Sequence, residues 1–415
     1  MLPAPVFTFT IPSIHDDTPL DCRIYHPIRF KNGDNSLSRW KKRGAVIAHP
    51  YAPLGGCYDD PVVLAAAAEI LKAGFIVARG AGSSKGRTSW TAKPELADYI
   101  SVVGCFIHYL QELEPNASSS PVQNSRYLDS VPLSPIQSAL PDFGNIFDSS
   151  ESQMILILGG YSYGSMITKN LPHTSQILAR FAEVTKGTAE AEIRMRALRL
   201  STQWNKQNRA SSRGRSLNVE DARQSQSHSI VTGGEESEPG SRRASRESRR
   251  SLDVVRRSVD RSRTKLGLRK ASDDGYPSSP PAEEKLGPIN VPHPKTHYLL
   301  ISPLLPPIST FATMFTKFDV EHISSSSQAR GTAVDTPDLD VNPISGPTLA
   351  IYGDKDFFTS RKKLRGWAEE ASQASNSRFR FHEIAGAGHF WHEDGAESQM
   401  RGFLSNWIQA ILTSA

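Results

Sequence analysis

The sequence predicts an α/β fold built on a doubly wound, mostly parallel sheet. Short apolar runs alternate along the chain with segments of helical periodicity, which is the pattern of a parallel sheet with helices on both faces. The runs at 44–49 and 75–79 read as buried strands, and the run at 154–158 is the most apolar of all, as expected for strands covered on both sides. The strands are expected at residues 6–9, 20–25, 44–49, 75–79, 154–158, 296–302, 348–352 and 378–384, with the first two pairing antiparallel.

Helical patterns separate these strands. Residues 60–73 are rich in Ala and Leu, with Asp59 or Asp60 near the N-cap. Residues 94–113 repeat apolar side chains at a spacing close to 3.6, after a proline suited to a first helical turn. Further helices are expected to begin at 163 or 164 and to cover 360–373 and 396–412.

The basic charge of the chain is confined to one segment. The whole chain of 415 residues carries a formal charge of +5, but residues 191–270 hold 20 Lys and Arg against 9 Asp and Glu. The remainder is therefore net acidic, at −6. A basic overall charge thus gives no general argument for nucleic-acid binding.

Composition also divides the chain into parts. Segments rich in Ser, Arg and Pro, with few apolar residues, cannot bury enough surface to offset the chain entropy lost on folding. The expected organisation is a first core part over 1–174 with a surface insertion at 114–151, a short helical cap over 175–208, a disordered Ser/Arg-rich insertion over 209–290 and a second core part over 291–415. The apolar surface of the cap is expected to comprise Ile177, Leu178, Phe181, Ile193, Met195, Leu198 and Leu200.

The chain is expected to be cytoplasmic. Its three cysteines have no metal-ligand or redox spacing, and the odd count argues against a disulfide framework. The first residues lack a cationic start followed by an apolar run, so no secretory signal is predicted. No run of 18 apolar residues predicts a transmembrane helix.

The strongest chemical signal is the segment Gly160-Tyr161-Ser162-Tyr163-Gly164. It follows the most apolar predicted strand and precedes a predicted helix, so Ser162 is expected on a sharp strand-to-helix turn, a nucleophile elbow. Such a turn brings the backbone so close together that only glycine fits two residues before and after the serine. The alternative interpretation is an ordinary Gly-rich turn with no chemistry.

A serine nucleophile requires a base, and the base requires an orienting acid. Asp356 and His389 each follow a predicted strand, at the sheet edge where the loops of such folds build active sites. Asp354 is the competing acid, with a turn-forming role as its alternative, and His392 is the competing base. The remaining histidines considered, namely His15, His26 and His108, are interpreted as surface or core residues.

Acyl transfer also requires donors for a developing oxyanion. One is expected to be the backbone N–H of Tyr163, directly after the serine. The other is expected to be that of Tyr51, in the loop after the strand at 44–49. His49 in the same loop is interpreted as structural.

Taken in their order along the chain, these motifs resemble those of the α/β-hydrolase superfamily. They are most similar to those of its dienelactone-hydrolase-like and serine-aminopeptidase-like intracellular serine hydrolases. The resemblance covers residues 40–112, 152–172 and 295–412 and rests on the motifs at 49–56, 79–86, 160–164, 353–356 and 386–389. Tyr51-Ala52-Pro53 departs slightly from the family's loop. In the family, Arg79 and the small residues after it form a structural turn. The resemblance implies a Ser-His-Asp hydrolase without metal or cofactor, and it leaves the substrate open.

The function expected from these observations is a serine esterase or related hydrolase that cleaves a small carboxylic ester, thioester or amide through an acyl-enzyme. The first alternative is a non-catalytic protein of the same fold that recruits partners through its basic arm. The second is a nucleic-acid-associated protein, which the lack of aromatic residues among the arginines disfavours. Arg242-Arg243-Ala244-Ser245 has the form that basophilic kinases read, which makes a kinase one candidate partner of the arm. The favoured alternative is that the arm is a tolerated, solvated loop.

Overall fold

The computed structural model describes residues 2–27, 41–86, 88–89, 91–114, 153–224, 285–289, 291–306 and 346–414. Residues 1–216 and 284–415 belong to one compact unit, and 217–283 belong to a second. Of the second unit, only 217–224 are described, as part of helix α5. The predicted insertion at 114–151 lies almost wholly outside the described residues, as do Ser245 and the whole of 225–284.

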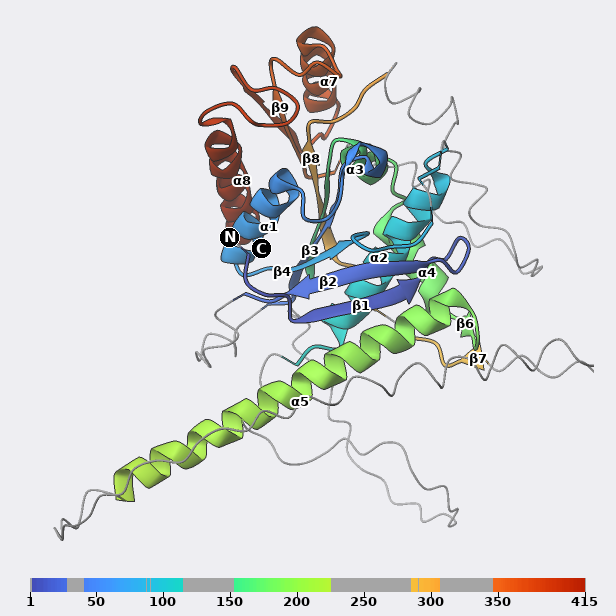
Figure 1. The fold of residues 1–415 in the computed structure, drawn as a ribbon, viewed down its shortest axis with the longest axis vertical. Helices are drawn as coiled ribbons and strands as arrows, with labels where there is room; N and C mark the ends of the chain where they lie inside the picture. Colours follow the sequence, from blue (N-terminus) through green and yellow to red (C-terminus); the bar gives the residue numbers. More distant parts are fainter. Residues whose placement is uncertain are drawn as a thin grey trace, which may run out of the picture. The chain divides into compact units, whose positions relative to one another are not determined.

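The first unit is built on an eight-stranded sheet (Figure 1). Strands β1 and β2 pair antiparallel, β2 pairs antiparallel with β4, and every other neighbouring pair is parallel. In spatial order the strands are β1 (Phe7–Pro12), β2 (Pro19–Tyr25), β4 (Ile76–Gly80), β3 (Arg43–Ala48), β5 (Ile155–Tyr161), β8 (Lys295–Ile301), β9 (Thr348–Gly353) and β10 (Phe379–Ile384). This arrangement confirms the predicted α/β fold class and the antiparallel pairing of the first two strands.

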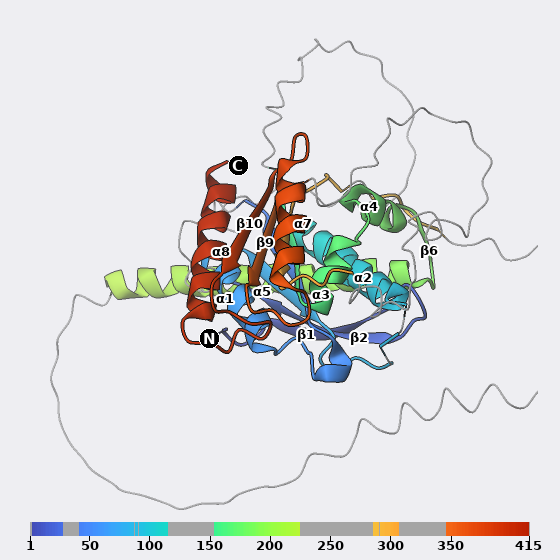
Figure 2. The same cartoon turned by 90° about the horizontal axis from the view of Figure 1, so that it is seen from above.

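Helices cover both faces of the sheet (Figure 2). On one face, α1 (Pro61–Lys72) and α8 (Ala396–Thr413) pack against a layer that includes Leu299 and Ile301 of β8. The other face carries α2 (Lys93–Gln111), α3 (Tyr163–Lys169) and α7 (Arg361–Gln373). Consecutive side chains of a strand point to opposite faces, so an apolar strand such as β8 serves both layers.

The start of α1 resolves one of the open alternatives. Asp60 is its N-cap, and a carboxylate oxygen of Asp60 accepts hydrogen bonds from the N–H groups of Val62 and Val63 at 2.9 and 3.4 Å. Pro61 follows at the first helical position, where its missing N–H costs nothing. The carboxylate thus satisfies two donors that would otherwise lack a partner at the helix start.

The segment predicted as a cap is helical, but it does not cover the predicted active site. It forms α4 (Thr174–Ala182), the short strand β6 (Val184–Thr185) and the start of α5 (Ala189–Gln224). Five of the seven predicted cap residues are buried in the core layer shared with α2; only Met195 and Leu198 are exposed.

Polar contacts place α5 at the C-terminal end of α2. Asn205 donates a hydrogen bond to the carbonyl of Glu112 at 2.9 Å, and the ring of Trp204 lies 4.1 Å from that of His26. Helices of a parallel sheet run opposite to its strands, so this end of α2 lies at the edge of the sheet opposite the carboxyl ends of the parallel strands. The cap prediction was therefore wrong in its location. A buried apolar stripe predicts that a helix packs against another part of the protein, but it does not predict which part.

The boundaries predicted for the disordered insertion were also wrong. Helix α5 continues through the predicted start at 209 as far as Gln224. Strand β7 (Lys285–Leu286) precedes the predicted end and pairs antiparallel with β6. Arg194 supports this pairing, since its guanidinium donates to the carbonyls of Phe181, Ala182 and Gly287. Among the residues that the structure describes, no helix is long and apolar enough to cross a membrane.

Buried histidines are expected to make the fold sensitive to acid. His297 on β8 is 3% exposed, and neither ring nitrogen has a hydrogen-bond partner within the described ranges. Burial, helped by the charges of Lys295 and Arg378, lowers the pKa of His297 to about 4 from a reference of 6.5. Between these two values the unfolded chain binds a proton that the folded chain does not. The free energy of unfolding therefore falls as the pH drops from about 6.5 toward 4.

We expect this histidine to account for about 2 kcal/mol of the stability lost between about pH 7 and pH 5. Urea unfolding at both pH values measures the loss. His297→Leu should reduce it, whereas His15→Leu, at an exposed position, should leave it unchanged. An identical loss of stability in the His297 variant and in the wild type would refute the assignment.

Candidate active site

Ser162 lies on a sharp turn between β5 and α3. Its backbone is in the left-handed half of conformational space, with φ of 55° and ψ of −117°, which a non-glycine residue rarely adopts. The N–H of Ser162 donates to the carbonyl of Ile301, at the end of the neighbouring strand β8, at 2.9 Å. The turn is thereby held at the carboxyl edge of the sheet.

The two glycines of this turn are required by close backbone contacts. A Cβ atom on Gly164 would lie 2.6 Å from the carbonyl oxygens of both Ala48 and His49, at the end of β3. A Cβ atom on Gly160 would overlap the backbone of Gly164. Neither position can therefore hold a side chain unless the backbone moves, as the sequence pattern predicts.

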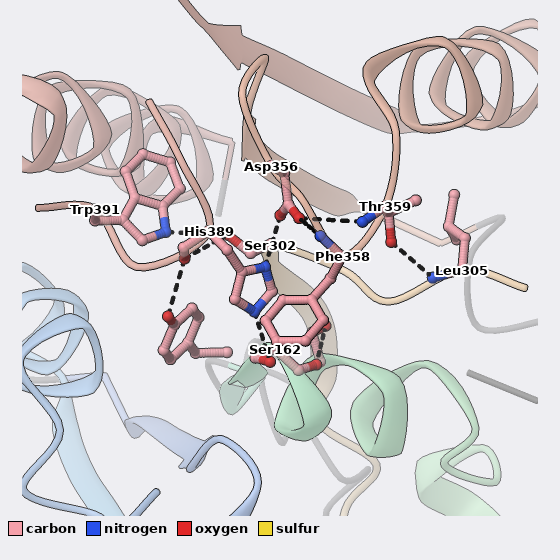
Figure 3. A network of polar contacts seen from close by, with 10 residues as sticks. Ser162, Ser302, Leu305, Asp356, Phe358, Thr359, His389 and Trp391 are labelled. Carbon is pink, nitrogen blue, oxygen red and sulfur yellow. Dashed lines mark hydrogen bonds and ion pairs between the residues drawn. The ribbon is translucent and has the colours of Figure 1, made fainter. Parts of the chain in front are cut away.

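Three loops at the carboxyl ends of strands bring Ser162, His389 and Asp356 together (Figure 3). Nε2 of His389 lies 2.8 Å from Oγ of Ser162, and Nδ1 of His389 lies 2.6 Å from Oδ2 of Asp356. All three residues are buried, with exposed fractions of 8% for the serine, 1% for the histidine and 5% for the aspartate. With its proton on Nδ1, the imidazole donates to the carboxylate and accepts from the serine hydroxyl.

The second oxygen of the Asp356 carboxylate is also held. Oδ1 accepts hydrogen bonds from the backbone N–H groups of Phe358 and Thr359 at 2.9 and 3.1 Å. The Thr359 hydroxyl accepts in turn from the N–H of Leu305, which joins this loop to the segment that follows β8 (Figure 3). These bonds fix the direction in which Oδ2 points.

The main chain of His389 is fixed by residues to which the sequence analysis gave no such role. Its carbonyl oxygen accepts a hydrogen bond from the Tyr161 hydroxyl at 2.9 Å and a longer one from the Ser302 hydroxyl at 3.4 Å. The same Ser302 oxygen accepts from the indole N–H of Trp391 at 3.0 Å. Only the position of Ser302, directly after β8 at the same sheet edge, would have marked it in the sequence.

The competing acid and base have other roles. Oδ1 of Asp354 accepts from the N–H of Gly386 at 2.6 Å, so this aspartate ties the acid loop to the histidine loop. His392 is exposed, and its ring lies 5.9 Å from that of Phe390. Their contacts therefore favour Asp356 and His389 over both competitors.

The three histidines interpreted from the sequence as surface or core residues occupy such positions. His15 is exposed, and His26 is buried with Nε2 2.7 Å from the hydroxyl of Tyr109. His108 is buried beside the ring of Phe181, and desolvation together with the nearby charge of Arg194 lowers its pKa to about 4.

Tyr51 and Tyr163, the predicted oxyanion donors, are neighbours. Their ring centroids are 5.0 Å apart, which places the loop after β3 beside the turn that carries the serine. In the same loop, Nδ1 of His49 lies 2.6 Å from the carbonyl oxygen of Pro50. Burial lowers the pKa of His49, which favours the neutral ring and fits a structural role.

Arg79, which the resemblance places in a structural turn, is fully buried on β4. Its guanidinium donates to the hydroxyl of Tyr25 and to the carbonyl of Tyr58, and it lies 3.8 Å from the carboxylate of Asp59. These contacts connect the strand to the loop that leads into α1.

A cavity of about 220 Å³ lies beside the serine turn, between the ends of β3 and β4 and the start of α2. Its lining includes the charged residues Lys85, Glu95 and Asp98 together with Tyr163. Burial raises the pKa of Asp98 to about 6, even though the Ser13 hydroxyl donates to its carboxylate. Ser162 and His389 are not among the residues that line this cavity, whereas Tyr163, directly after the serine, is.

The sequence matches no known protein-family model and no curated protein. Solved structures do match it. An α/β serine hydrolase without a lid from Xanthomonas campestris is 13% identical, with a TM-score of 0.43 over 99% of this chain and 96% of the other. An α/β serine hydrolase homologue from Coxiella burnetii is also 13% identical, with a TM-score of 0.41 over 98% and 99%.

Another match is Est1E from Butyrivibrio proteoclasticus, which is 10% identical with a TM-score of 0.39 over 98% of this chain and 99% of the other. The chain is thus similar in structure to α/β serine hydrolases.

Proposed function

We propose that this chain, with its α/β-hydrolase fold, is a serine hydrolase in which Ser162 is the nucleophile, His389 the general base and acid, and Asp356 the residue that orients His389. One observation carries the proposal. A continuous line of hydrogen bonds of 2.6 and 2.8 Å connects the carboxylate, the imidazole and the hydroxyl. The three groups come from separate loops, and no two of them are neighbours in sequence.

In the proposed reaction, Oγ of Ser162 attacks the carbonyl carbon of the substrate while Nε2 of His389 takes the hydroxyl proton. The carbonyl π electrons move onto oxygen, which gives a tetrahedral oxyanion. When the bond to the leaving group breaks, the imidazolium gives its proton to the leaving oxygen, sulfur or nitrogen. The acyl group then remains esterified to Ser162.

Water completes the cycle by the same chemistry in reverse. His389 takes a proton from the water, whose oxygen attacks the acyl carbon, and then returns a proton to Oγ of Ser162 as the carboxylic acid leaves. The Asp356 carboxylate stabilises the imidazolium that forms twice in each cycle. The two backbone N–H groups that hold Oδ1 suit this role, because they prevent the carboxylate from turning away.

The oxyanion is assigned to the backbone N–H groups of Tyr163 and Tyr51. Tyr163 begins α3, where the first N–H groups have no acceptor within the helix. The contact between the two tyrosine rings supports placing both N–H groups beside the serine. The proposed substrate class is a small carboxylic ester, with thioesters and amides open to the same chemistry.

Labelling with a fluorophosphonate probe tests the proposal, because such probes react with an activated serine. The wild type is expected to be labelled at Ser162, Ser162→Ala to take up no label, and His389→Ala to react far more slowly, since the hydroxyl then has no base. A wild type that takes up no label, or label that persists in Ser162→Ala, would refute the enzyme assignment.

A further inference from the structure

We propose that Phe357 and Phe390 bind the leaving group of the substrate, and that they select esters of apolar, preferably aromatic, alcohols. This inference rests on the proposed serine hydrolase function and adds to it the class of alcohol. Together with Phe358, the two residues are called the aromatic rim below.

The aromatic rim surrounds the imidazole of His389. Ring centroids of Phe390 and Phe357 lie 5.4 and 6.1 Å from that of His389, and Phe358 packs edge-on against it at 4.5 Å (Figure 3 shows Phe358). The three rings also contact one another, with centroids 4.4 to 6.1 Å apart. Because Phe357 and Phe358 directly follow Asp356, and Phe390 directly follows His389, the loops that position the acid and the base also build the rim.

Two of these rings are left in solvent. Phe357 is 66% exposed and Phe390 is 45% exposed, whereas the adjacent Asp356 and His389 are almost fully buried. A single exposed apolar side chain is ordinary on a protein surface, but two that touch each other beside a buried polar cluster form a patch. An apolar group that covers them would remove both rings from water, which is favourable in proportion to the area covered.

The mechanism decides which part of the substrate lies against this patch. His389 must give its proton to the leaving oxygen, so that oxygen has to come within hydrogen-bond distance of Nε2. The carbonyl oxygen is assigned to the N–H groups of Tyr51 and Tyr163 instead. Whatever is attached to the leaving oxygen therefore lies on the histidine side of the site, where the rim is.

The rim favours a ring over an alkyl chain. Aromatic pairs prefer offset or edge-on contacts with centroids 4.5–7 Å apart, which add to the gain from covering apolar area. Each such contact changes affinity by about two- to tenfold. A benzyl or phenyl leaving group within reach of both exposed rings is thus expected to be preferred over a small alkyl group by at least about tenfold.

Two ester series separate the leaving group from the acyl group. The first keeps acetate and varies the alcohol (ethyl, cyclohexylmethyl and benzyl acetate), and the second keeps methanol and varies the acid (methyl acetate, hexanoate and phenylacetate). The kcat/KM values are measured by titrating the released acid at constant pH. The wild type should favour benzyl over ethyl acetate by at least about tenfold.

The double variant Phe357→Ala/Phe390→Ala should lower this benzyl-to-ethyl ratio to about twofold or less, with little change in the ratios of the methyl-ester series. Phe357→Leu/Phe390→Leu keeps apolar area without rings, so it should retain discrimination against ethyl acetate and lose the preference for benzyl over cyclohexylmethyl. Leu198→Ala is the matched control, because it also removes an exposed apolar side chain, at 53% exposure, but on α5 away from the site. Its ratios should equal those of the wild type.

Fluorophosphonate labelling of each variant keeps the two proposals distinguishable. If Ser162 of the double variant is still labelled and its benzyl-to-ethyl ratio equals that of the wild type, the rim does not bind the leaving group. If the methyl-ester ratios change in place of the acetate ratios, the rim holds the acyl group and the inference is wrong. If the wild type itself takes up no label, the proposed function fails, and this inference fails with it.

Discussion

Replacing Ser162 by Ala should lower kcat by about 10⁶-fold, because the alanine offers no nucleophile and the acyl-enzyme route is closed. The remaining rate would come from binding and from the oxyanion donors acting on attack by water. Stability should change little, since Ala fits the position of a small side chain and the N–H that bonds to Ile301 is retained. Steady-state hydrolysis of a responsive ester by purified wild type and variant measures the effect.

Ser165 offers a matched control one helical turn later. It is also buried, and its hydroxyl donates to the carbonyl of Ser162 at 2.7 Å, but it has no contact with His389 within the described part of the chain. Ser165→Ala should therefore reduce the rate by less than about tenfold. Equal losses in the two variants would mean that the turn is needed only as structure, and would contradict the role given to Ser162.

Asp356→Asn should lower kcat by about 10⁴-fold, a loss of the size seen when the acid of a Ser-His-Asp triad becomes an amide. An amide cannot stabilise the imidazolium. Its NH₂ group can also face Nδ1, which then accepts a hydrogen bond and leaves the proton on Nε2. In that tautomer His389 cannot take the proton from Ser162.

Asp354→Asn separates the two candidate acids. Asn keeps an oxygen that can accept from the N–H of Gly386, so the link between the acid and histidine loops survives. The expected change in kcat is less than about tenfold. If the larger loss occurs in Asp354→Asn and not in Asp356→Asn, the assignment of the acid is wrong.

The sequence was sufficient to predict the sheet because its central strands, such as β3, β4 and β5, are mostly apolar and are separated by helices with clear periodicity. The turn that carries Ser162 could be predicted from strand β5 and from the glycines on either side of the serine. Gly164 approaches the end of β3 so closely that a residue with a side chain would not fit there. Asp356 and His389 followed from the order of strands along the chain. Residues at the carboxyl ends of neighbouring parallel strands meet at one edge.

The support around the site was not predictable, because much of it is made by backbone atoms. Main-chain N–H groups hold the Asp356 carboxylate, and the main-chain carbonyl of His389 accepts from Tyr161. The identity of a residue does not reveal which hydrogen bonds its main chain makes. Such bonds depend on loop conformation. Ser302, with φ of 45°, is placed by a turn that its residue type does not predict.

Helices α4 and α5 were misplaced for a different reason. Their apolar residues predict a buried face, but a hydrophobic stripe does not name its partner. Contacts with α2 decided the outcome, including the ring of Phe181, which occupies the space that a side chain on Gly104 would need. The continuation of α5 to Gln224 shows that an anchored helix can extend into a segment of low apolar content.

The central claim is that Ser162 carries the acyl group during the reaction. The most direct test is to mix the protein with an activated acetate ester, quench with acid within the first turnover and measure the intact mass, followed by sequencing of the modified peptide. We predict a gain of one acetyl group on Ser162 in the wild type and none on Ser162→Ala. Acetyl located on another residue, or turnover without any acetylated protein under conditions in which acylation is faster than deacylation, would contradict the mechanism.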